Sequence, residues 1–253
     1  MAPVRASLVT WRLPNGWLDL ARQFALFAAA YYLYRVVRGL VDGRAADAFA
    51  NARELISLEQ SLNLFVEPSI HAWATGREWM IDSASWMYVN SHFTVTFGTL
   101  AFIYMFRNES FYFVRNMFMV AMGLALVGYV IYPTAPPRFL PEWGFSDSVA
   151  EFTGVSSSSA SVNVLFNPFA AVPSMHVGFA LMLGGAMTRL VSSTAVKALW
   201  ATYPLVVTFV VVATANHFWM DAVLGALVAA VAAWSAQGLF ARARPHAWAF
   251  ARA

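Results

Sequence analysis

Long apolar segments repeat along the whole chain of 253 residues, and they restrict its fold more than any other feature. Hydrophobic residues make up 60% of the sequence and charged residues only 11%, whereas a soluble domain carries about 25% charged residues. Inside a bilayer the backbone must satisfy its own hydrogen bonds, so an apolar segment of about 20 residues crosses as a helix. The sequence therefore predicts an all-α, polytopic membrane protein.

Six segments have the length and apolar character of membrane-spanning helices, which predicts a six-helix bundle in one integral membrane domain, residues 1–253. Their predicted limits are residues 17–41, 84–106, 111–132, 174–189, 196–214 and 218–240. Residues 47–66 alternate apolar and charged positions at helical spacing, which predicts an extra amphipathic helix along the membrane interface. A weaker apolar segment follows Pro68 at residues 70–81, and residues 133–172 form the longest loop.

Lysine and arginine are divided unevenly between the two sides of the predicted bundle. An even number of spans places both termini on one side, where ten of the 16 Lys and Arg residues fall, against six on the other. The positive-inside rule then predicts cytoplasmic termini in a bacterial plasma membrane, with residues 133–172 outside it. The absence of cysteine excludes disulfides and thiolate metal sites, and no dense basic run indicates a nucleic-acid partner.

Two histidines, an arginine and an aspartate are predicted to meet at the extracytoplasmic ends of the spans. His176 begins the fourth span and His217 precedes the sixth, so both lie at one surface, which Arg138 reaches after the third span. His217 and Asp221 are four residues apart, so the carboxylate can orient the imidazole ring. This set suits phosphoryl transfer, because His217 can attack phosphorus, His176 can protonate the leaving oxygen and Arg138 can clamp the phosphate.

Further polar residues are candidates for binding the phosphate. Ser174 is a predicted N-cap, and the free backbone N–H groups beside it offer a seat for an anion. Asn216 directly precedes His217 and is a neutral candidate for the same role. Arg35 and Arg38 lie three residues apart at the extracytoplasmic end of the first span, so either is a candidate for a second cation.

Two further residues are candidates to contact the site, and one histidine is expected to lie away from it. His92 lies within the second span, where an ionisable side chain is a candidate to contact the substrate or a catalytic group. Glu59, on the amphipathic helix, is a candidate partner for one of the arginines. His71 is expected at the surface.

The short motifs around these residues resemble those of the type 2 phosphatidic acid phosphatase superfamily. Residues 173–176, with the sequence Pro-Ser-Met-His, resemble its second motif. His217 with Asp221 resembles its third motif, and Arg138 resembles the arginine of its first. The order of these motifs and their positions at membrane exits make the resemblance specific.

The resemblance extends over about residues 59–230, and residues 132–138 and 167–176 are more similar to the branch that contains inositol phosphorylceramide synthases. It implies a catalytic core of about residues 84–240, with His217 as a nucleophile that forms a phosphohistidine and without a metal or other cofactor. It further implies a lipid phosphate of phospholipid, polyprenyl or sphingolipid type as substrate, and an alcohol such as inositol as acceptor.

Two positions depart from the phosphatase pattern. Ile131 stands where the first motif has a lysine, and Val211 stands where the third motif has an arginine. With two phosphate-binding cations missing, transfer of a phosphorylated headgroup is favoured over hydrolysis, unless Arg35 or Arg38 replaces them. Hydrolysis of a lipid phosphate without an alcohol acceptor is the nearest alternative.

Two further alternatives come from other classes. A lipid or ion transporter would use the polar cluster as a binding site, although the cluster lies at span ends and no inverted repeat is visible. A metal site could be built from His176, His217 and Asp221, and sensitivity to a chelator would distinguish it from a metal-free mechanism.

Overall fold

The computed structural model describes residues 13–39, 43–155 and 169–240 of the chain. These residues form helices and their connections, and the extended pairing within them is a single bridge between Thr134 and Ala170. The prediction of an all-α fold is therefore confirmed for the described part of the chain.

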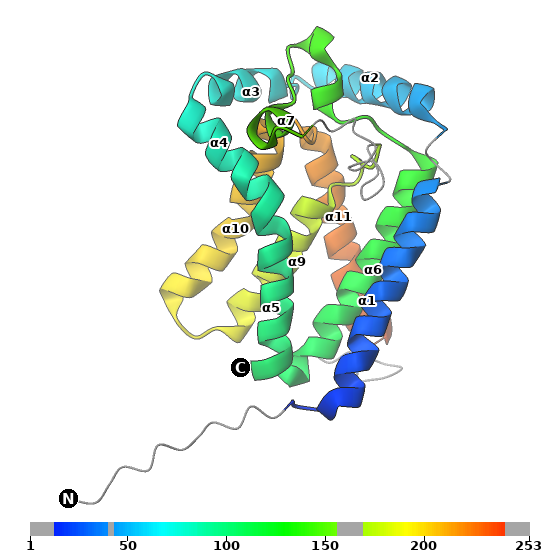
Figure 1. The fold of residues 1–253 in the computed structure, drawn as a ribbon, viewed down its shortest axis with the longest axis vertical. Coiled ribbons are helices and arrows are strands. Elements are labelled where there is room, and N and C mark those ends of the chain that lie inside the picture. Colours follow the sequence, from blue (N-terminus) through cyan, green and yellow to red (C-terminus); the bar gives the residue numbers. More distant parts are fainter. Residues whose placement is uncertain (1–12, 40–42, 156–168, 241–253) are drawn as a thin grey trace, which may run out of the picture.

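A bundle of long helices forms the body of the protein (Figure 1). Its members are α1 (Gly16–Gly39), α5 (His92–Phe106), α6 (Asn108–Ile131), α9 (Met175–Leu190), α10 (Thr194–Ala213) and α11 (Trp219–Ser235), which continues into the π-helical turn η4 (Ala236–Phe240). Helix α9 is central, because it packs against α5, α6, α10 and α11. Helix α1 packs on α6 at the periphery, and much of its outer face is exposed.

Shorter helices cover one end of this bundle (Figure 1). They are α2 (Ala45–Ser61), α3 (Glu67–Thr75), α4 (Glu78–Trp86), η2 (Pro137–Phe139), η3 (Pro141–Trp143) and α7 (Ser148–Thr153). Helix α2 has the predicted amphipathic character, since Ala48, Ala52 and Ile56 are fully buried while its charged face is exposed. Its apolar face packs on Leu140 of the long loop and on Phe218, the residue that precedes α11. These short helices, which we call the cover, are thereby joined to the start of α11.

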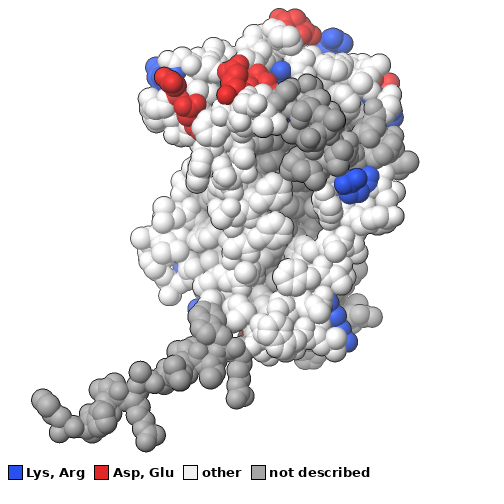
Figure 2. All heavy atoms as spheres, in the orientation of Figure 1, with Lys and Arg blue, Asp and Glu red and all other residues white. Residues whose placement is uncertain are grey.

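Three of the described helices are long and apolar enough to cross a membrane: Asn108–Ile131, Thr194–Ala213 and Trp219–Gly238. In Figure 2 the middle of the visible face is nearly free of charged side chains, and Asp and Glu gather at the end covered by the short helices. These features fit an integral membrane protein. Helices α1, α5 and α9 run beside the three apolar helices (Figure 1), and a crossing by each of them stays a prediction.

Some boundaries differ from those predicted from the sequence. The weak segment at residues 70–81 is divided at Gly76 into α3 and α4, and Pro68 lies in the first turn of α3. The predicted second span begins within α4, continues through the π-helical turn η1 (Met87–Ser91) and ends with α5. The loop at residues 133–172 contains η2, η3 and α7, so much of it has helical structure of its own.

Glycine allows the starts of α9 and α11 to touch. A Cβ atom at Gly225 of α11 would lie 2.2 Å from the carbonyl oxygen of Ser174, which no side chain can tolerate without a shift of the backbone. A Cβ at Gly178 of α9 would lie 3.2 Å from the Gly225 carbonyl oxygen. The N–H of Ser174 also donates to the backbone carbonyl of Asp221 at 2.9 Å. The two helix starts are therefore in direct backbone contact.

Candidate active site

A tight turn between α10 and α11 presents His217. The N–H groups of Asn216 and His217 both donate to the carbonyl of Val211, at 2.9 and 3.1 Å. Ala215 within the turn has a φ of 53°, a left-handed conformation that costs free energy in a residue other than glycine. The chain is thus redirected sharply, and His217 lies just before the first turn of α11.

His217 and Asp221 form a buried pair. Asp221 Oδ2 lies 3.1 Å from His217 Nδ1 and also accepts the N–H of Phe218 at 2.9 Å. Burial, followed by the positive charge of Arg138, lowers the pKa of His217 below its ordinary value, so the ring is neutral near pH 7. When Nδ1–H is donated to Asp221, the lone pair on Nε2 is available to attack an electrophile.

His176 faces His217 from the first turn of α9. His217 Nε2 and His176 Nδ1 are 3.3 Å apart. On its other sides the His176 ring stacks on Tyr88, at a centroid distance of 4.7 Å, and contacts His92 at 4.2 Å. A phosphoryl group bound to His217 Nε2 would have to enter between the two imidazole rings. His176 would then lie beside the phosphate oxygens, where it can exchange a proton with the leaving group.

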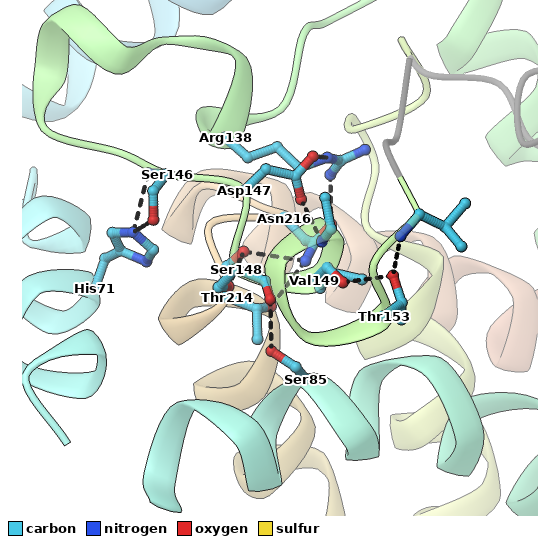
Figure 3. A network of polar contacts seen from close by, with 12 residues as sticks. His71, Ser85, Arg138, Ser146, Asp147, Ser148, Val149, Thr153, Thr214 and Asn216 are labelled. Carbon is cyan, nitrogen blue, oxygen red and sulfur yellow. Dashed lines mark hydrogen bonds and ion pairs between the residues drawn. The ribbon is translucent and has the colours of Figure 1, made fainter. Parts of the chain in front are cut away.

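Arg138 reaches the same place from η2. Its N–H donates to the carbonyl of Ala215 at 2.8 Å, so the turn that carries His217 also fixes the backbone of Arg138. Its Nη1 donates to Asn216 Oδ1, and its Nε lies 3.9 Å from Asp147 Oδ2. Figure 3 shows how these three side chains converge from η2, the long loop and the turn before α11. A guanidinium has five N–H donors, so donors remain for a phosphate.

A cavity of about 420 Å³ connects these groups. Its polar wall includes Arg138, Asp147, His176, Asn216 and His217. Its apolar wall includes Tyr34 of α1, Val89, Phe93, Tyr129 and Met175. The cavity therefore combines a cation and two imidazoles with an apolar surface, an arrangement that fits the phosphate end of a lipid.

The structure brings five of the candidates together: His176, His217, Asp221, Arg138 and Asn216 lie in one connected set of contacts. His92 also belongs to the site, because it lines the cavity and contacts His176.

The other candidates lie elsewhere. Ser174 is fully buried outside the cavity lining, and its N–H donates to the Asp221 carbonyl, so it holds α9 against α11. Arg35 is exposed on α1 and is not part of the cavity wall. The side chain of Arg38 lies outside the described residues. Glu59, expected beside an arginine, instead accepts the N–H of Met220 at 2.8 Å.

His71 was expected at the surface, and that prediction is wrong: the residue is 2% exposed. Its Nδ1 lies 2.8 Å from the Ala213 carbonyl oxygen, and its Nε2 accepts the N–H of Ser146 at 3.1 Å. It thereby braces the end of α10 against the segment that carries Asp147 (Figure 3). Its partners are 142 and 75 residues away in the sequence, so no local pattern reveals them.

Two residues of the site were missed in the sequence. In the sequence Tyr88 is one aromatic residue among several in an apolar span, yet in the structure it stacks on His176. Asp147 reads as a solvated loop residue, yet it faces Arg138. Of these two residues, only Asp147 could have been suspected from the sequence, since it shares a long loop with Arg138.

In the described ranges, no three His, Asp or Glu side chains are arranged to hold a metal ion.

Comparison with known proteins agrees with this geometry. Residues 53–235, well over half of the chain, match the family model described as the PAP2 superfamily. The chain therefore belongs to the PAP2 superfamily, and this membership supports an activity of the lipid phosphatase type. The match does not separate the inositol phosphorylceramide synthase branch from the others. No curated protein and no solved structure matched the chain.

Proposed function

We propose that this protein is a membrane phosphotransferase that moves a phosphorylated headgroup from a phospholipid to an alcohol, through a covalent intermediate on His217. The observation that supports the proposal most strongly is the buried His217–Asp221 pair, whose free ring nitrogen faces His176 beside Arg138. This arrangement provides a nucleophile, an acid and an anion clamp within one cavity.

The charge of the cavity favours a phosphodiester as the group that is attacked. A phosphate monoester carries up to two negative charges, whereas a diester carries one. Among the described residues that line the cavity, Arg138 is the one Lys or Arg, and Asp147 offsets part of its charge. The two positions where the phosphatase motifs have cations are apolar here: Ile131 is 71% exposed and Val211 is buried between helices.

The reaction then has two half-reactions of the same kind. His217 Nε2 forms a bond to phosphorus while the bond from phosphorus to the leaving oxygen of the lipid breaks, and that oxygen takes a proton from His176. The acceptor hydroxyl next attacks phosphorus and returns a proton to His176, while the phosphorus–nitrogen bond breaks and frees His217. Both half-reactions use the same side chains, so hydrolysis differs from transfer only in that water replaces the alcohol as the acceptor.

We expect the product formed from the acceptor alcohol to reveal the transfer directly. Purified protein should be incubated with phosphatidylinositol or phosphatidic acid, each with and without alcohol acceptors, while free phosphate and new lipids are followed. Transfer predicts that the diester is consumed faster when an alcohol is added, that diacylglycerol is released, and that a phosphodiester joining the headgroup to the added alcohol forms. Rapid release of phosphate from phosphatidic acid, unaffected by alcohols, would contradict transfer and establish a hydrolase.

The site is proposed to face the extracytoplasmic side, with both termini in the cytoplasm. The support is the excess of Lys and Arg on the terminal side and the gathering of Asp and Glu at the covered end (Figure 2). In intact cells, a membrane-impermeant maleimide should label Glu151→Cys, an exposed position in α7. The matched variant Ser192→Cys, exposed between α9 and α10, should react only after permeabilisation. The opposite pattern would reverse the orientation.

A further inference from the structure

Two carboxyl groups from the cover bind the start of α11. Glu59 Oε1 of α2 accepts the N–H of Met220 at 2.8 Å, and Glu67 Oε1 of α3 accepts the N–H of Trp219 at 2.6 Å. Both glutamates are completely buried. They are 161 and 152 residues from their partners, so these are tertiary contacts and not local helix caps.

These contacts complete the binding of the first turn that follows His217. The first N–H groups of a helix have no partner within the helix. Here Phe218 N–H binds Asp221, Trp219 N–H binds Glu67 and Met220 N–H binds Glu59. Because Asp221 is also the partner of the His217 ring, the position of this turn decides where the imidazole points.

The two glutamates also lie close enough for the charge of Glu67 to raise the pKa of Glu59. Their Oε1 atoms accept neighbouring backbone N–H groups, and the Oε2 atom of each carboxyl is buried without a hydrogen-bond partner in the described part of the chain. A hydrogen bond between two carboxyl groups requires that one of them holds a proton. Two ionised carboxylates in this buried position would repel each other and leave both oxygens unsatisfied.

We propose that Glu59 and Glu67 are positioning residues that share one proton and, as a neutral–anionic pair, hold the first turn of α11 so that His217 and Asp221 stay aligned. This inference rests on the proposed role of His217 as nucleophile. Neither glutamate lines the cavity, so both act through α11 and not on the substrate.

The proton makes the arrangement sensitive to alkaline pH. Burial and then the charge of Glu67 raise the pKa of Glu59 from 4.5 to about 8, with a smaller contribution of the same sign from Asp221. The N–H of Met220 acts in the opposite direction. Because the pKa of Glu59 is raised in the folded protein, protonated Glu59 stabilises the fold. This stabilisation is fully present below about pH 4.5 and is lost as the pH rises through about 8. Above that pH the pair becomes doubly negative and should release the turn.

The test compares the parent with Glu59→Gln in detergent, over pH 6 to 10. Glutamine cannot lose the proton, yet its oxygen can still accept from Met220 and its amide can donate to Glu67. We expect the parent to lose kcat, and Tm, as the pH rises through about 8. Glu59→Gln should keep both across this range. Glu54→Gln is the matched control, because Glu54 is exposed on the same helix, and it should behave as the parent does.

A second variant, Glu59→Ala, tests whether the hydrogen bond to Met220 matters independently of the charge on Glu59. Glu59→Ala leaves the N–H of Met220 without its acceptor, and kcat on phosphatidylinositol should fall about tenfold or more with KM little changed. Rescue of that loss by Glu59→Gln supports the pair. An alkaline fall in kcat and Tm that is the same in the parent and in Glu59→Gln would overturn the inference.

The two proposals fail differently. The Tm measurement needs no substrate, so it tests the shared proton even in a protein that does not turn over phosphatidylinositol. A parent without activity on any phospholipid, but with the expected shift of Tm and its loss in Glu59→Gln, would contradict the proposed function and retain the shared proton.

Discussion

Replacing His217 by alanine is expected to abolish turnover and to leave the fold intact. The Nε2 atom of His217 is the nitrogen that faces His176 at 3.3 Å within the cavity, while its Nδ1 is held by Asp221. Without the proposed nucleophile no covalent intermediate can form, and the losses seen when a nucleophile is removed reach about a millionfold. Activity should therefore fall to background on every phospholipid that the parent uses.

The measurement should detect the intermediate as well as the rate. A donor lipid labelled at phosphorus should leave an acid-labile label on the parent, as expected of a phosphorus–nitrogen bond, and none on His217→Ala. Thermal unfolding and size-exclusion chromatography in detergent establish that the variant is folded. His92→Ala is a suitable comparison, because His92 lines the same cavity but contacts no carboxylate in the described part of the chain, and it should keep the label. A labelled His217→Ala protein with near-parent activity would disprove the assignment.

Replacing Asp221 by asparagine should lower kcat by about three to four orders of magnitude, by analogy with other histidines that an aspartate orients. Asparagine keeps the size of the side chain and can still accept one hydrogen bond, from Phe218 or from His217. It cannot accept both with a full negative charge, so the imidazole loses the group that fixes its tautomer and stabilises its positive charge.

The expected signature is a fall in kcat with little change in KM, since Asp221 is fully buried behind His217 and does not line the cavity. Asp147→Asn provides the control. Asp147 is a carboxylate of the cavity wall that faces Arg138 at 3.9 Å, and its loss should alter KM more than kcat. A loss below about tenfold in Asp221→Asn would show that the residue supports the helix start and not the chemistry.

The helices of the bundle could be located from the sequence because the length of an apolar segment is a local property. The predicted span at residues 111–132 corresponds to α6, and the span at 196–214 to α10, each within about three residues. The meeting of His176 and His217 was accessible for a related reason, since two successive helices that reverse direction return to one surface. Local spacing also gave the pairing of His217 with Asp221.

Contacts between distant segments could not be predicted in this way. Helical spacing places Arg35 and Arg38 near one another on α1, but it does not say which way that face points, and Arg35 proves to be exposed. The environment of Glu59 depends on a backbone N–H 161 residues away, so a glutamate on an amphipathic helix was expected to meet a cation. His71 was misplaced for the same reason, because its partners are a backbone carbonyl and the segment at Ser146.

The backbone contact between α9 and α11 has a mechanical consequence. Gly225 and Ser174 join the two helices within one turn of His176 and close to Asp221, so we expect this junction to act as a pivot near the two histidines of the proposed site. When bilayer thickness changes, helices adjust by tilting, and the largest displacements occur far from the point where they are joined. Shear at the opposite ends of α9 and α11 should therefore leave the spacing of the two imidazoles almost unchanged. An enzyme built in this way would keep its reaction geometry in membranes of different thickness.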